Sequence, residues 1–185
     1  MIRALLLCGG RSTRFGSDKL LAGGEPLALQ SARTLRTGAG SVLAVMPPER
    51  PELRRILESA GCEILETDRT WRGLGASLAA GVEATSSASG WIVALGDMPL
   101  VKAKTIAAVK AALEKGATIA APFHGGERGH PVGFSAALRN ELVALDEDVG
   151  ARSVLERHAG DVVHVQVDDA GIFIDVDTPE DLKRI

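Results

Sequence analysis

The residues best suited to chemistry gather in the stretch LCGGRSTRFGSDK, residues 7–19, directly after a short apolar run. Its glycines allow backbone with positive φ and a close approach of N–H groups to an anion, and its basic side chains add positive charge around them. These residues are Gly9, Gly10, Gly16, Arg11, Arg14 and Lys19. The combination predicts a phosphate-binding loop, although it matches neither GxxxxGK[ST] nor GxGxxG. A solvent-exposed glycine turn with incidental basic residues is the structural alternative.

Acidic residues follow two later apolar runs. Asp97 comes directly after WIVALG, and a carboxylate there could hold Mg²⁺, which takes one or two carboxylates and completes its coordination with water and substrate phosphate. Asp175 and Asp177 lie in IFIDVDTPEDL, and by alternation they share a face from which either could meet Asp97. A helix cap at Asp97 and solvent exposure of the later pair are the alternatives. Thr178 and Asp181 are typical of a helix N-terminal capping box.

Elements that would position these residues can be predicted from periodicity. Short apolar runs bounded by Gly, Pro or Asp predict strands at 2–8, 41–46, 62–66, 91–95 and 117–122. Helical patterns lie between them at 26–37, 51–60, 76–82 and 102–115. The alternation predicts a doubly wound α/β domain with a mostly parallel sheet and helices on both faces. Ligands bind beyond the carboxyl ends of such strands, where the glycine-rich stretch and Asp97 lie.

The last third of the sequence has a different character. It begins with a polar segment, HGGERGHPVGFS, which we expect to be a loop, and continues with two helical patterns within 135–158. Strands are predicted at 162–167 and 172–176. We interpret this part as an elaboration on the substrate side and expect a single domain over residues 1–185.

Composition narrows the classes of function. The 185 residues are 45% apolar, enough for one globular domain, and carry a net charge of −3 without a basic run, so no nucleic acid or anionic membrane partner is expected. No apolar run reaches the length of a membrane span. Cys8 and Cys62 are not spaced as a metal site, and Cys8 is expected to be a small core residue. A reducing, cytoplasmic location is therefore expected.

Four motifs together resemble one known family. The glycine-rich loop, GDMP, GHPVGF and DVDTPEDL occur in this order between residues 5 and 182, as in the MobA-like nucleotidyltransferases, which include the molybdenum cofactor guanylyl- and cytidylyltransferases. The resemblance implies a Rossmann-like, three-layer domain of the nucleotide-diphospho-sugar transferase type. It also implies that the domain binds a nucleoside triphosphate and Mg²⁺, transfers the nucleoside monophosphate to a phosphorylated acceptor, and releases pyrophosphate.

The resemblance also assigns roles to residues. The stretch TWRGLGASLAAGV matches the nucleotide side of the family, so the implied nucleotide site comprises Leu7, Cys8, Gly9, Gly10, Ser12, Arg14, Gly16, Lys19, Gly73, Gly75 and Ser77. Arg14 and Lys19 would be catalytic with Asp97, by steadying the departing pyrophosphate. Asp97 would bind the metal, with Asp175 or Asp177 as its helper. His130, in GHPVGF, would lie in the acceptor pocket, although a histidine before proline in a loop is more often structural.

The base and the acceptor are less constrained. The guanylyl members usually have LAGG where this sequence has LCGG, but GDMP, GHPV and the acids at 175 and 177 resemble the cytidylyl branch. We therefore expect CMP transfer from CTP to molybdopterin, with transient contact with a molybdoenzyme or its chaperone. Guanylyl transfer from GTP and a methylerythritol-phosphate or sugar-phosphate acceptor are the alternatives. A non-catalytic nucleotide-binding protein that delivers a cofactor is an alternative of another class, and loss of Asp97 or Lys19 would mark it.

Overall fold

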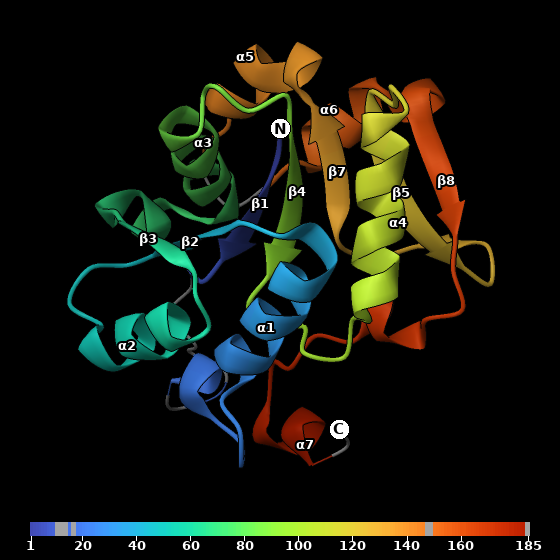
Figure 1. Cartoon of the computed structure of the whole chain (residues 1–185). Helices are drawn as coiled ribbons and strands as arrows, with labels where there is room; N and C mark the ends of the chain where they lie inside the picture. The colour runs from blue at the N-terminus through green and yellow to red at the C-terminus, as the bar shows by residue number, and fades with distance from the viewer. Residues whose placement is uncertain (10–14, 16–17, 147–149, 184–185) are drawn as a thin grey trace.

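The structure is a computed structural model that describes residues 1–9, 15, 18–146 and 150–183 (Figure 1). Its strands are β1 (Ile2–Leu7), β2 (Val42–Met46), β3 (Glu63–Glu66), β4 (Gly90–Leu95), β5 (Ile119–His124), β6 (Glu127–Arg128), β7 (Val132–Ser135) and β8 (Val162–Gln166). Its α-helices are α1 (Leu27–Ala39), α2 (Pro51–Ser59), α3 (Leu74–Ala84), α4 (Ala103–Glu114), α5 (Arg139–Val143), α6 (Arg152–Arg157) and α7 (Pro179–Leu182). The elements expected in the first two thirds are therefore confirmed, with differences only at their ends.

The strands form one eight-stranded sheet in the described chain, in the order β3-β2-β1-β4-β7-β5-β6, with β8 paired to β5. Strands β1 to β4 are parallel to one another, and β7 is antiparallel to both β4 and β5. The chain runs outward from β1 to β3 and then returns to place β4 on the other side of β1. This reversal opens a crevice at the carboxyl ends of β1 and β4, the usual ligand site of such sheets.

Helices cover both faces of this sheet, which gives three layers (Figure 1). Residues alternate along β1 because successive side chains of a strand point to opposite faces. Ala4 and Leu6 join the core under α1, α2 and α4, whereas Leu5 and Leu7 join the core under α3, α5 and α6. The expected three-layer α/β fold with a mostly parallel sheet is thus confirmed.

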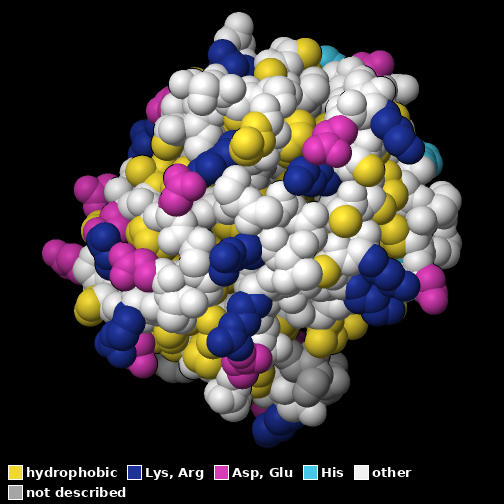
Figure 2. Space-filling model, in the orientation of Figure 1, with side chains coloured by type: hydrophobic (Ala, Val, Ile, Leu, Met, Phe, Trp, Pro, Cys, Tyr) yellow, Lys and Arg dark blue, Asp and Glu magenta, His cyan; other side chains and the backbone are white. Residues whose placement is uncertain are grey.

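The surface is mixed in character. On the face drawn in Figure 2, Lys and Arg side chains are interspersed with Asp and Glu. Large apolar side chains that remain partly exposed include Leu100, Phe173 and Ile174, which lie on the segments that follow β4 and β8. Within the described ranges, no helix has both the length and the apolar character needed to cross a bilayer.

The expected loop at 124–135 is wrong, because this segment supplies β6 and β7. Val132 and Phe134 are buried under α3, α5 and α6, whereas Gly133 faces α4. A β-carbon at Gly133 would lie 2.8 Å from Leu113 Cδ1 and 3.0 Å from Val109 Cγ1, so only glycine fits. The strand was missed because its short Val-Gly-Phe alternation forms no apolar run.

The strand expected at 172–176 is also wrong, because this segment begins with the 3₁₀ turn η6 (Ala170–Phe173). The buried carboxylate of Asp169 folds the turn, since it accepts hydrogen bonds from Gly171 N at 3.1 Å and from Lys102 N at 2.9 Å. It also accepts one from Thr105 Oγ1 at 2.6 Å, and so ties the start of α4 to η6.

Replacement of this carboxylate should destabilise the fold. Asp169→Ala leaves the buried donors Thr105 Oγ1 and Gly171 N and the part-buried Lys102 N without this acceptor, and we expect the free energy of unfolding to fall by about 3 kcal/mol. Urea denaturation monitored by circular dichroism measures the change. Asp168→Ala is the matched control, because the side chain of Asp168 is exposed and only its carbonyl is bonded, by Lys102 Nζ. Equal stability of the two variants would contradict the role assigned to Asp169.

Candidate active site

Lys19 lies between two carboxylates at the carboxyl end of the sheet. Its Nζ donates to Asp97 Oδ2 at 2.7 Å and to Asp177 Oδ1 at 2.8 Å. The three side chains are 14%, 19% and 27% exposed, so the cluster is largely withdrawn from solvent. Burial alone would lower the pKa of Lys19, but the charge of Asp97 and the hydrogen bonds to both carboxylates outweigh it and raise the pKa. The lysine is therefore held in its charged form.

Three distant parts of the chain position these groups. Asp97 follows β4, whose end is fixed by a hydrogen bond from Gly96 N to Leu7 O at 3.0 Å. Lys19 opens the 3₁₀ turn η1 (Lys19–Leu21), which Asp18 caps by accepting from Leu20 N. Asp18 is in turn ion-paired with Arg50. These contacts hold the segment of Asp18 and Lys19 beside the end of β4.

Asp177 is positioned by the helix cap that the sequence predicted. Thr178 and Asp181 form a capping box at the start of α7, and Asp177 N donates to Asp181 Oδ2 at 3.2 Å. Val176 N also donates to Asp97 O at 3.0 Å, which joins this segment to the end of β4. Asp175 is exposed, and the hydrogen bonds of Lys19 go to Asp97 and Asp177 instead. Asp97 does not cap α4, whose N-cap is Lys102.

The glycine-rich stretch begins against α3. A β-carbon at Gly9 would lie 3.1 Å from Ser77 Oγ and 3.4 Å from Thr70 Cβ, so a larger residue here would crowd these side chains. Gly10, Ser12, Arg14 and Gly16 lie outside the described residues. Leu7 and Cys8 are buried, and burial raises the pKa of the Cys8 thiol. Cys8 is thus a core residue, as expected.

The nucleotide-side stretch predicted at 73–77 forms the start of α3. Gly73 precedes the helix with a φ of 127°, a conformation that favours glycine, and its carbonyl accepts from Ser77 Oγ at 2.9 Å. Gly75 and Ser77 are buried. The structure therefore brings Ser77 of this stretch beside Gly9.

The donor set at Asp97 fits a hard divalent cation. Asp97 Oδ1 is buried and has no hydrogen-bond partner, so it is an acceptor with an unmet demand. Mg²⁺ characteristically binds one or two carboxylates and retains water and phosphate as its other ligands. Among the residues that the structure describes, no group of three or more His, Cys, Asp or Glu could hold a metal. The site therefore suits a metal ion that takes one or two carboxylates from the protein and has water and phosphate as its other ligands.

A pocket of about 240 Å³ opens on the α3 and α6 side of the sheet. Its apolar walls come from α3, β4, β7 and α6, and the polar groups at its edge are Arg128, His130 and Arg152. Arg128 and Arg152 also border a neighbouring hollow of about 490 Å³. No pattern in the sequence singled out these two arginines, because they lie in a polar hairpin and on a short exposed helix.

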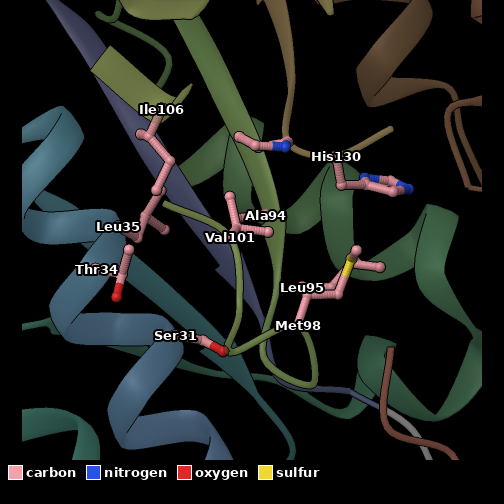
Figure 3. A pocket seen from close by; sticks show the side chains of 10 residues that line it. Ser31, Thr34, Leu35, Ala94, Leu95, Met98, Val101, Ile106 and His130 are labelled. Carbon is pink, nitrogen blue, oxygen red and sulfur yellow. The ribbon is translucent and has the colours of Figure 1, made fainter. Parts of the chain in front are cut away.

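His130 lines both this pocket and a smaller cavity of about 10 Å³ beside α1 and α4. In Figure 3 its imidazole points away from Ser31 and Leu35 of α1. The Nδ1 atom is buried without a partner, and burial, followed by the charge of Arg128, lowers the pKa of His130. Its ring is therefore neutral at pH 7 and can donate or accept one hydrogen bond.

The end of α6 is anchored by His158. Its Nε2 lies 2.8 Å from Glu141 Oε1 on α5 and its Nδ1 lies 3.3 Å from Asp161 Oδ2. Hydrogen bonds to these two carboxylates raise the pKa of His158 above its ordinary value of 6.5. The protonated ring thus links α5 to the helix that walls the pocket.

The sheet, its crevice and the charged residues at the strand ends place the chain in the class of the α/β nucleotidyltransferases. More particularly, residues 4–162 match the MobA-like NTP transferase domain, and the chain belongs to that family. A curated relative is the bifunctional protein GlmU of Maricaulis maris, 30% identical over 159 residues, which are 83% of this chain and 34% of GlmU. This chain spans about a third of the length of the GlmU proteins that it matches.

Solved structures confirm the fold. Rv0371c from Mycobacterium tuberculosis superposes with a TM-score of 0.86 at 24% identity, over 99% of this chain and 95% of that chain. A second structure of Rv0371c, in complex with manganese, gives 0.80 at 22% identity over 99% and 96% of the two chains. Molybdopterin-guanine dinucleotide biosynthesis protein A from Archaeoglobus fulgidus gives 0.66 at 20% identity over 98% and 95%. The fold is thus of the nucleotide-diphospho-sugar transferase type.

The His158 linkage should make stability depend on pH. Because its pKa is raised in the folded state, the stabilisation is fully present below the unfolded pKa of 6.5 and disappears as the pH rises through the folded pKa. We expect His158→Gln to lower the thermal midpoint at pH 5.5 and to have a much smaller effect at pH 8.5. Arg157→Gln removes a non-titrating partner of Glu141, so its effect should not change over this range. A His158→Gln effect of equal size at both pH values would contradict the linkage.

Proposed function

We propose that this chain transfers a nucleoside monophosphate from a nucleoside triphosphate to a phosphorylated acceptor and releases pyrophosphate. The observation that carries the proposal is the placement of Lys19 between Asp97 and Asp177, at the carboxyl ends of the strands that flank the crevice. Membership of the MobA-like NTP transferase family supports the same reaction. The more specific form of the proposal is CMP transfer from CTP to molybdopterin.

The triphosphate binds, in this proposal, at the glycine-rich stretch. Backbone N–H groups from Leu7 to Gly16 and the side chains of Ser12, Arg14 and Lys19 neutralise its charge. Arg14 and Lys19 steady the pyrophosphate as it departs. Gly73, Gly75 and Ser77, at the start of α3, contact the base or ribose, which is supported by the position of Ser77 beside Gly9.

The metal would be held by Asp97, with Asp177 as its helper and Asp175 as the more exposed alternative. When bound, Mg²⁺ would neutralise the charge that develops on the triphosphate oxygens. The manganese complex of Rv0371c supports use of a divalent metal in this fold. Asp97 meets the requirement best because its Oδ1 is buried and without a hydrogen-bond partner.

The acceptor occupies the pocket beside β7 in this proposal. An acceptor phosphate is already anionic at neutral pH, so it can attack the α-phosphorus without a general base, which explains why none is needed near Asp97. Arg128 supplies positive charge at the rim, and the neutral His130 orients the acceptor through its unpartnered Nδ1. The apolar walls favour an acceptor with a sizeable non-polar part.

The motifs favour cytidine as the base. GDMP, GHPV and the acids Asp175 and Asp177 resemble the cytidylyl branch, although LCGG is closer to the guanylyl form. The shared fold does not decide between the bases, because a molybdopterin-guanine dinucleotide biosynthesis protein also has it. Guanylyl transfer, transfer to a methylerythritol phosphate or sugar phosphate, and non-catalytic delivery of a cofactor remain the alternatives. We also propose a cytoplasmic, single-domain chain whose product passes by transient contact to a molybdoenzyme or its chaperone.

The reaction can be tested by pyrophosphate release. With Mg²⁺ and molybdopterin, we expect CTP to be used at least about tenfold faster than GTP, UTP or ATP, because a site that hydrogen-bonds one base leaves polar groups unpaired with the others. Asp97→Asn should reduce the rate by about a hundredfold or more. Asp168→Asn, an exposed acid outside the site, is the matched control and should retain the full rate.

Each other outcome points to a different alternative. Preference for GTP would overturn the choice of base and retain the reaction. A raised thermal midpoint with a nucleotide but no pyrophosphate release from any pair of substrates would favour the non-catalytic protein.

A substitution in the proposed acceptor site should weaken binding of the acceptor and leave binding of the triphosphate nearly unchanged. Arg128→Gln removes the charge at the rim of the pocket, so we expect KM for the acceptor to rise about tenfold or more while KM for the triphosphate stays nearly constant. Arg55→Gln, at an exposed position on α2, is the control and should alter neither constant. Steady-state kinetics with each substrate varied in turn would measure the split, and an equal rise in both constants would refute the assignment.

A further inference from the structure

We propose that Lys19 acts as a built-in cation that occupies the metal position until a triphosphate draws it away, so that metal and triphosphate bind together. This inference rests on the proposed function, since it concerns the metal that nucleotidyl transfer uses. It assigns Lys19 a second role, which is control over when Asp97 and Asp177 are available to a metal.

The geometry carries the first step. The ammonium group of Lys19 lies 2.7 Å from Asp97 Oδ2 and 2.8 Å from Asp177 Oδ1, so both carboxylates contact the same positive charge. A divalent ion bound to the same oxygens would lie at about 2.1 Å from them, where it would collide with the ammonium group. Lysine and metal therefore exclude each other from this position.

The charges carry the second step. Both carboxylates and the ammonium group are largely withdrawn from solvent, so the charge of Lys19 acts on both carboxylates with little screening. With Lys19 in place, the only oxygen of Asp97 without a hydrogen bond is the buried Oδ1. While Lys19 is in place, its positive charge repels a dication from this oxygen, which would attract one once the lysine has moved away. Metal alone should consequently bind weakly.

The position of Lys19 in the chain carries the third step. It stands at the end of the glycine-rich stretch and opens η1, so its backbone belongs to the same segment that would meet the triphosphate. Its long side chain has a rotatable ammonium group and can exchange one anion for another without movement of the backbone. A triphosphate thus offers the lysine new partners and delivers the metal that replaces it. By linkage, metal and triphosphate each raise the affinity for the other.

Direct metal binding tests this control in the absence of any nucleotide. The probe is Mn²⁺ alone, with the free ion measured by electron paramagnetic resonance. We expect Lys19→Met to bind Mn²⁺ at least about tenfold more tightly than the unaltered protein, because loss of a nearby positive charge removes both repulsion and competition. Lys19→Arg keeps the cation and should bind as weakly as the unaltered protein. Lys110→Met, which removes a lysine bonded to Ala39 O, is the matched control and should also bind weakly.

A second variant locates the site. Lys19→Met combined with Asp97→Asn should lose the gain in affinity. Equal Mn²⁺ affinity of Lys19→Met and the unaltered protein would overturn the proposal, and so would a gain that survives Asp97→Asn. If Lys19→Met does not fold, Lys19→Gln replaces it, because it also removes the positive charge. A folded Lys19→Gln variant without a gain in Mn²⁺ affinity would likewise overturn the proposal.

The outcome is separable from that of the transfer assay. If Lys19→Met gains affinity and no substrate pair releases pyrophosphate, the lysine control holds and the proposed reaction is wrong. If transfer occurs and Lys19→Met gains no affinity, the reaction holds and the lysine control is wrong.

Discussion

The contact of Lys19 with Asp97 and Asp177 is the constraint on which the site depends, because none of these charges can be withdrawn from water alone. The three residues come from near the start, the middle and near the end of the chain, so their meeting fixes how those parts sit together. Local devices then serve this contact. Asp18 and Arg50 secure the lysine, the end of β4 holds Asp97, and the capping box of α7 holds the segment of Asp177.

The antiparallel strand β7 joins the site to the core. Val132 and Phe134 lie on the face that borders the pocket, and Gly133 lies on the opposite face, against α4. The strand therefore has to satisfy packing on one side and ligand space on the other within four residues. His130 precedes it directly and lines both the smaller cavity and the open pocket. A small change in the packing of α4 against β7 would therefore shift residues that line the proposed acceptor pocket.

The sequence allowed the parallel half of the fold to be predicted because β1, β2 and β4 are largely buried on both faces and form continuous apolar runs. Asp97 could be located because it follows such a run. β7 was not predicted because a glycine separates its two apolar residues, so the sequence shows no apolar run there. No strand forms at 172–176 because Asp169 folds the start of this segment into a turn. The partnership of Lys19 and Asp177 was also beyond prediction, since they lie 158 residues apart. Contacts of that kind depend on topology, whereas runs and caps are local.

Asp97 has to satisfy two opposing demands if the chain transfers nucleotides. In the resting structure it partners Lys19 and stabilises the fold, and in the working complex it would partner a metal. Two arrangements of the same carboxylate can coexist only if their free energies are close, and the ligand that favours one of them then sets the population. A lysine suits such an exchange because its ammonium group is a compact charge on a flexible stem, whereas arginine would lock the carboxylates in a fixed, two-pronged contact. The choice of lysine at position 19 therefore links the stability of the empty site to the ease with which it can be filled.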